Sequence, residues 1–208
     1  NSRDYNLSFT EPYFLGYRLA AGFDVFKNED DSEDYYSVDT QGFTLRVTAP
    51  ITEDLSTTLR YSYARLDYKT SLDFDDPDDR EELASPYWDV VNNGPWVRSS
   101  LAHSVTFDTI DDRTLPRDGI FAQITQEFAG LGGDSEYYKI SGKARYYHML
   151  LEDADVIGSI AVSGGHMWGF GDTKVYDQFN LSGSDLRGFE SSGIGPRATS
   201  TGDALGGT

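Results

Sequence analysis

Long segments of strict period-two alternation constrain this chain more than any other feature of its sequence. In the clearest segment, residues 36–49, Phe43 and Leu45 alternate with Thr44 and Arg46. Successive side chains of a β-strand point to opposite faces, so the pattern predicts a strand with one apolar and one polar face. The pattern recurs in segments near residues 5–10, 17–25, 55–63, 97–108, 120–128, 138–146 and 156–168. We therefore predict an all-β fold with about eight strands.

The predicted strands are long, and the connections between them alternate in length. The strands span about 10–16 residues, whereas strands in soluble proteins average about 5 or 6. Short connections lie near residues 12–16, 50–54, 111–118 and 151–154, long ones at 27–35, 69–95 and 171–208, and one of intermediate length at 129–135. Short periplasmic turns opposite long extracellular loops are typical of outer-membrane barrels. A soluble β-sandwich would also alternate, but strand length and loop asymmetry favour an antiparallel transmembrane β-barrel.

Composition excludes several classes of site. The formal net charge of −18 argues against a nucleic-acid surface, which requires clustered lysine and arginine. The acidic residues concentrate in residues 29–34 and 73–82, as expected of solvated loops. Because the chain has no cysteine, disulfides and thiolate metal sites are impossible. No run approaches the roughly 18 apolar residues that a membrane helix needs.

In such a barrel the polar strand faces line the lumen. A charged side chain that faces lipid costs about 2–4 kcal/mol near the bilayer midplane, so charges must point inward. The side chains predicted to line the lumen are Arg18, Asp24, Arg46, Arg60, Arg98, Asp108, Glu127, Lys139, Lys143 and Arg145. The aromatic residues predicted to form girdles at the two membrane interfaces are Tyr13, Phe14, Tyr17, Tyr68, Tyr137 and Phe170.

The C-terminal segment carries the most specific motif, Leu186-Arg187-Gly188-Phe189 followed by Ile194-Gly195-Pro196-Arg197. Together with residues 9–24, 114–119 and 126–134, in this order, it resembles the BamA-type proteins that assemble outer-membrane proteins, in their alphaproteobacterial form. The resemblance covers the whole chain. It implies a fragment that corresponds to the fourth to eleventh strands of a sixteen-stranded barrel, with most of the sixth extracellular loop.

The resemblance also implies a division of the chain and roles for the loop residues. Residues 1–170 would form part of the transmembrane barrel, and residues 171–208 a long extracellular loop that folds into the lumen. Arg187 would be the anchor of this loop, Gly188 would permit its turn, and Phe189 would be its apolar wedge. The usual acidic partners of the arginine would follow residue 208, which leaves Asp185 and Glu190 as local alternatives.

The function implied by the resemblance is the folding and insertion of β-barrel proteins into the bacterial outer membrane. The expected partners are the lipid bilayer, unfolded outer-membrane clients and, through periplasmic domains outside this sequence, accessory lipoproteins. One alternative is a translocation barrel of two-partner secretion or autotransporter assembly, which shares the Arg-Gly loop. Another is a passive porin, which has no need of such a loop.

No residue set predicts enzymatic chemistry, a metal site or a cofactor. Residues 73–79 are rich in aspartate but lack the spacing of a calcium loop, so they are interpreted as a solvated loop. His103, His148 and His166 lie on different predicted strands without metal-ligand spacing. The glycines of residues 130–133 and 163–165 are interpreted as turn and barrel-curvature glycines.

Overall fold

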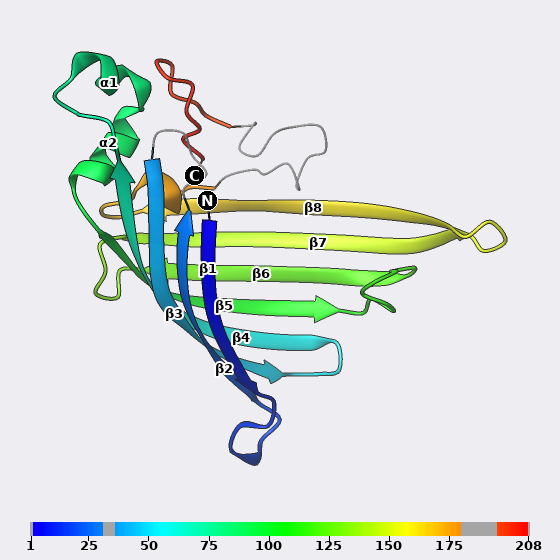
Figure 1. Cartoon of the computed structure of the whole chain (residues 1–208). Helices are drawn as coiled ribbons and strands as arrows, with labels where there is room; N and C mark the ends of the chain where they lie inside the picture. Colours follow the sequence, from blue (N-terminus) through cyan, green and yellow to red (C-terminus); the bar gives the residue numbers. More distant parts are fainter. Residues whose placement is uncertain (1, 31–35, 180–194, 208) are drawn as a thin grey trace.

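The chain forms one curved antiparallel sheet followed by an irregular C-terminal segment (Figure 1). The computed structural model describes residues 2–30, 36–179 and 195–207. Each strand pairs with the next in sequence. The strands are β1 (Ser2–Glu11), β2 (Ala20–Asp30), β3 (Tyr36–Pro50), β4 (Leu55–Thr70), β5 (Trp96–Asp108), β6 (Gly119–Ala129), β7 (Tyr137–Leu151) and β8 (Val156–Gly169). The predicted all-β fold with about eight strands is confirmed.

The connections differ in length between the two ends of the sheet. At the end that we call the short-turn end, the connections span residues 12–19, with the 3-10 turn η1 (Phe14–Gly16), 51–54, 109–118 and 152–155. At the other end, which we call the long-loop end, the β4–β5 connection contains helices α1 (Pro77–Glu82) and α2 (Ser85–Asn92). In Figure 1 these helices stand above the long-loop end, beside the C-terminal segment. The prediction of a long connection at residues 27–35 was wrong, because β2 continues to Asp30 and only residues 31–35 join it to β3.

The two helices were not predicted, since the sequence indicated only a solvated acidic loop. Local signals account for them. Asp76 caps α1 by accepting a hydrogen bond from the backbone N–H of Asp78, and Pro77 occupies the first turn, where its missing N–H costs nothing. Trp88 and Val90 of α2 are buried, so the helix also packs against the rest of the protein.

The strand register separates a polar face from an apolar face. Residues paired on neighbouring antiparallel strands point to the same side of the sheet. One row on the polar face joins Thr10, Gly22, Arg46, Arg60, Ala102, Glu127, Lys139 and Met167. The adjacent row on the apolar face joins Phe9, Phe23, Leu45, Tyr61, Leu101, Phe128, Tyr138 and Trp168.

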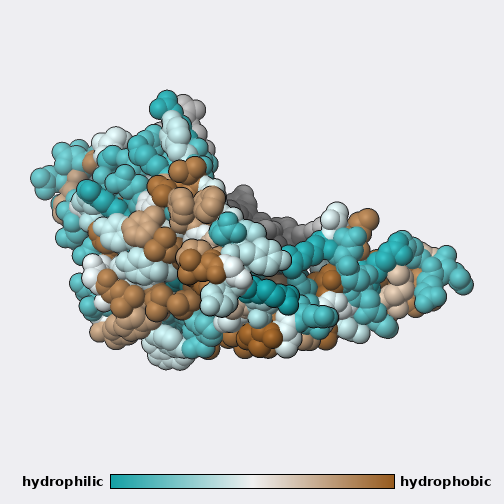
Figure 2. All heavy atoms as spheres, turned by 90° about the horizontal axis from the view of Figure 1, so that it is seen from below, coloured by the Kyte–Doolittle hydropathy of each residue, from teal (hydrophilic) through white to brown (hydrophobic). Residues whose placement is uncertain are grey.

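The apolar face is exposed to its surroundings. Leu7, Val162 and Ile160 each leave about two-thirds of their surface accessible, at 65%, 66% and 65%. In Figure 2 the molecule is bent, and apolar side chains gather along the outer side of the bend. No helix among the described residues is long and apolar enough to cross a membrane.

Two of the six predicted girdle aromatics face the other way. Tyr137 is 1% exposed and pairs with Ala129 and Gly169 on the polar face. Tyr68 lies on the same side, and its ring centroid is 5.8 Å from that of Tyr36 in a tilted arrangement. The prediction of a girdle position was wrong for both, because period two places these rings on the same side as the charged residues.

Candidate functional site

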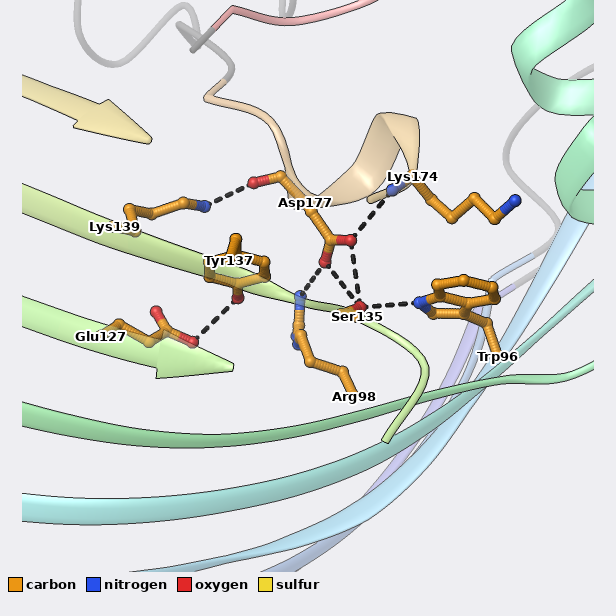
Figure 3. Close-up of polar contacts among 8 residues, drawn as sticks. All are labelled: Trp96, Arg98, Glu127, Ser135, Tyr137, Lys139, Lys174 and Asp177. Atoms are coloured by element: carbon orange, nitrogen blue, oxygen red, sulfur yellow. Dashed lines mark hydrogen bonds and ion pairs between the residues drawn. The ribbon is translucent and has the colours of Figure 1, made fainter. Parts of the chain in front are cut away.

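The strongest polar cluster lies where the chain, after β8, returns over the polar face. The segment turns in a short 3-10 helix, η2 (Val175–Asp177), which places the Asp177 carboxylate against the sheet (Figure 3). Asp177 is fully buried. Its carboxylate accepts hydrogen bonds from the Ser135 hydroxyl at 3.0 Å and the Lys174 backbone N–H at 3.0 Å. Arg98 of β5 lies 3.8 Å away as its ion-pair partner.

Neighbouring side chains extend this cluster across four segments of the chain. The indole N–H of Trp96 donates to the Ser135 hydroxyl at 2.7 Å, and the Lys139 ammonium donates to the Asp177 carbonyl at 2.5 Å (Figure 3). Asp177 therefore binds to β5, to β7 and to the connection between β6 and β7. A buried carboxylate with this many donors holds the returning segment in one place, because any displacement would leave it without hydrogen bonds.

Phe179 supplies the apolar part of the same anchor. Its ring packs against a small buried cluster of Ala129, Tyr137 and Met167. The Lys139 ammonium lies 4.7 Å from the ring centroid, within range of a cation–π contact. Together, Asp177 and Phe179 form what we call the loop anchor.

The two ends of the motif-bearing segment meet at this anchor. Phe179 and Gly207 form an isolated antiparallel bridge, with N–H to carbonyl distances of 2.8 and 2.9 Å. The residues between them, which include the Leu186-Arg187-Gly188-Phe189 motif, therefore leave and return at one point on the polar face.

The returning segment is also tied to the helices of the β4–β5 connection. Asp203 accepts a hydrogen bond from the backbone N–H of Ala84 at 2.9 Å. The Tyr87 hydroxyl donates to the Ala204 carbonyl at 2.7 Å. Lys174 forms an ion pair with Asp89 of α2. The loop anchor and the helices thus form one connected assembly at the long-loop end.

The structure places the predicted lumen-lining residues as follows. Nine of the ten share the polar face of the sheet, whereas Arg18 lies exposed in the connection before β2. The nine are Asp24, Arg46, Arg60, Arg98, Asp108, Glu127, Lys139, Lys143 and Arg145. Arg46 pairs with Asp24 across β2 and β3, and Glu127 accepts a hydrogen bond from the Tyr137 hydroxyl at 3.0 Å.

The motif residues Leu186, Arg187, Gly188, Phe189 and Ile194 lie outside the described residues. Pro196 and Arg197 are described, and they form a hairpin-like return. The Arg197 guanidinium donates to the Gly202 carbonyl at 2.6 Å, and the Pro196 carbonyl accepts from the Leu205 N–H at 2.9 Å. Gly195 has φ of +136°, a conformation that favours glycine.

Sequence reasoning did not single out Asp177, Ser135 or Phe179. One signal was present, because residues 177 and 179 open the segment that carries the motif. Among the described residues, no group of three or more histidine, aspartate and glutamate side chains is placed to hold a metal ion.

Burial raises the pKa of the Asp177 carboxyl group and outweighs the Lys174 N–H and Arg98, which lower it. An unfolded aspartate has a pKa of about 3.9. Between that value and the higher folded pKa, the folded state holds a proton that the unfolded state has released, so stability falls as pH rises. We expect the wild type to lose stability relative to Asp177→Asn as pH rises from about 4 to 7. Urea unfolding of both proteins across this pH range measures the difference, and parallel pH profiles would contradict it.

Comparison with known protein families shows to which family the chain belongs. A family model described as the Omp85 superfamily domain matches residues 1–208. The chain belongs to the Omp85 superfamily. Outer membrane protein assembly factor BamA of Neorickettsia risticii is 27% identical over 208 residues, which is 98% of this chain and 26% of that protein. BamA of Nitratidesulfovibrio vulgaris is 31% identical over 204 residues, or 96% of this chain and 24% of that protein.

This Omp85 chain also resembles a eukaryotic protein and a solved barrel. The human sorting and assembly machinery component 50 homolog is 34% identical over 119 residues, which cover 55% of this chain and 24% of that protein. The crystal structure of Haemophilus ducreyi BamA lacking POTRA domains 1–3 matches 94% of this chain and 39% of that chain, with a TM-score of 0.71 and 22% identity. The fold is therefore a barrel segment of this kind. The Omp85 chain spans about a quarter of the length of its BamA relatives.

Proposed function

We propose that this chain forms part of the wall and the lumen loop of a BamA-type barrel that folds and inserts β-barrel proteins into the bacterial outer membrane. The observation that carries the proposal is the similarity to BamA proteins across nearly the whole chain. The docked segment after β8 supports it, because the resemblance to BamA proteins implies a motif-bearing loop that folds onto the polar face. The proposed activity needs no covalent chemistry, because client strands would be guided by pairing at strand edges.

In this proposal, residues 1–170 belong to the barrel wall and residues 171–208 to an extracellular loop that enters the lumen. The polar face would then line the lumen and the apolar face would contact lipid. The exposed leucine, isoleucine and valine side chains of the apolar face support this orientation. The clients would be unfolded outer-membrane proteins, and accessory lipoproteins would bind to periplasmic parts of the assembly.

The motif arginine has a defined role in the proposal. The loop anchor fixes the base of the loop, and Arg187 would fix its tip by pairing with carboxylates of the barrel interior. Guanidinium suits this role because it is always charged and offers a planar fork of donors. The closed base formed by Phe179 and Gly207 is the first of these two points of attachment.

A client-folding experiment tests the function. The protein with its complete barrel is reconstituted in liposomes, and folding of an unfolded barrel client is followed by its heat-modifiable mobility. We expect liposomes with the wild type to fold the client faster than empty liposomes. Arg187→Ala should remove most of the acceleration, because the loop tip loses its charged attachment. Arg117→Ala is the matched control, since Arg117 is half-exposed in a short turn and pairs with Asp155.

Two results would contradict the proposal in different ways. If the client folds no faster than with empty liposomes and the protein conducts ions steadily, the proposed assembly function is wrong. A porin function would then explain the result. Equal acceleration by wild type and Arg187→Ala would retain assembly and remove the arginine from the mechanism.

A further inference from the structure

A groove on the apolar face crosses β1 to β4 near the long-loop end. Two adjacent register rows line it. The inner row is apolar and consists of Leu7, Val25, Phe43 and Tyr63. The row next to it, nearer the long loops, is polar and consists of Tyr5, Lys27, Gln41 and Arg65. We call the space along these eight residues the interfacial groove. Asp4, Asn6, Phe26 and Gly42 also border it, and its volume is about 1010 Å³.

The change from apolar to polar marks a boundary on a face that is otherwise covered by apolar side chains. Below the boundary, Leu7 is 65% and Val25 48% exposed, so these side chains need an apolar solvent. Above it, Lys27 and Arg65 have stems long enough to lie along apolar surface while their charged ends reach a polar layer. This order of side chains is that of the border between hydrocarbon and lipid headgroups.

Among the described residues, the charges around the groove leave Arg65 and, one row further out, Arg3 without an ion pair. The next row outward on this face consists of Arg3 and three acids, Glu29, Asp39 and Asp67. Glu29 pairs with Lys27 at 2.5 Å, whereas Asp39 and Asp67 lie 2.5 and 3.8 Å from Lys69. Each of these acids thus has a cation. Within the described part of the chain, Arg65 makes no ion pair, although its guanidinium borders the groove.

We infer that the interfacial groove binds the phosphate headgroup of a membrane lipid. Arg65 supplies the main charge, because its guanidinium matches the geometry of phosphate oxygens. Lys27 adds a weaker attraction because Glu29 already neutralises part of its charge, and Gln41 offers an amide donor between the two cations. The first part of an acyl chain would lie on Val25 and Phe43. The inference rests on the membrane placement within the proposed function, and not on assembly activity.

The test measures lipid retention. The protein with its complete barrel is placed in bilayer nanodiscs of phosphatidylcholine with a small fraction of phosphatidylglycerol, released into mild detergent and weighed by native mass spectrometry. Lys27→Gln combined with Arg65→Gln should reduce retained phosphatidylglycerol between about fivefold and about 25-fold, since each cation near a membrane surface contributes a factor of about five and Glu29 neutralises part of the Lys27 charge. Retained phosphatidylcholine should change little, because it carries no net charge.

The matched control is Lys143→Gln combined with Arg145→Gln. It removes one lysine and one arginine from the opposite face, where neither side chain forms an ion pair with the described residues. This variant should retain phosphatidylglycerol as the wild type does. If both double variants lose the same amount of phosphatidylglycerol, the effect comes from net charge, and the site is overturned.

Further outcomes separate the site from the proposals on which it rests. If the Lys27→Gln, Arg65→Gln variant inserts normally and retains as much phosphatidylglycerol as the wild type, the site alone is overturned. Failure of the wild type to insert into nanodiscs overturns both the membrane placement and the site. If inorganic phosphate displaces all of the phosphatidylglycerol, the groove would be a site for a free anion. This result would overturn the inference that it binds a lipid headgroup.

Discussion

Replacement of Asp177 by alanine is expected to release the returning segment from the polar face and to lower the free energy of unfolding by about 3 kcal/mol. Removal of one partner from a buried charge pair costs about 3–5 kcal/mol, and we take the lower end because Arg98 keeps 32% of its side chain exposed. The loss has three sources, one of which is the Lys174 backbone N–H that loses its acceptor. Ser135 loses its acceptor, and Arg98 loses its counter-charge while it stays partly buried. Denaturant unfolding of the refolded protein in micelles measures the change.

A labelling experiment distinguishes release of the segment from a general loss of stability. The chain contains no cysteine, so a single Met167→Cys substitution reports on one position. Met167 is 3% exposed beneath the ring of Phe179. Maleimide should therefore label it slowly in the wild-type background and much faster with Asp177→Ala, under conditions where the sheet stays folded.

Asp172→Ala is the control for this prediction. It removes the same charge from the same segment, but Asp172 is exposed. Its backbone carbonyl, which accepts from the Glu136 N–H, remains in the variant. Equal stability of Asp177→Ala and Asp172→Ala, with unchanged labelling at position 167, would show that the carboxylate is not an anchor.

Most of the fold was predictable because one physical pattern determines it. Alternation assigns each side chain to a face, and a shift of one residue would place Arg46 and Arg60 on the apolar side. Register is thus strongly specified by the charges of the polar face and the aromatics of the other. The helices after β4 were missed for a different reason: helical period has little room to appear in segments of six and eight residues.

The candidate site was less accessible to sequence reasoning. The motif indicated the correct segment, but the anchor at Asp177 depends on contacts with residues far away in sequence, such as Ser135 and Arg98. Alternation placed Arg98 and Lys139 on one face without indicating which acid would approach them. Similarly, Gly165 was interpreted as a curvature glycine, whereas the structure gives it a packing role under Phe179.

That packing role leads to the second prediction: Gly165→Ala should displace the Phe179 ring and lower the free energy of unfolding by about 1–3 kcal/mol, as overpacking does. A Cβ atom at this position would lie 2.7 Å from the Phe179 ring and 2.8 Å from the Ile140 carbonyl oxygen. Both distances are below van der Waals contact, so the ring and the strand must shift. Denaturant unfolding gives the stability, and labelling of Met167→Cys reports displacement of the ring.

Gly164→Ala is the matched control, because a Cβ atom there meets nothing within 4 Å. Both substitutions reduce backbone freedom by the same amount in the same strand, so a difference between them comes from contacts alone. A third variant, Gly165→Ala combined with Phe179→Ala, separates the two collisions. If the ring is the main obstacle, the double variant should be little less stable than Phe179→Ala alone. A full additional loss would instead assign the cost to the Ile140 carbonyl, and Gly165 would then serve the strand pairing of β7 and β8 rather than the loop anchor.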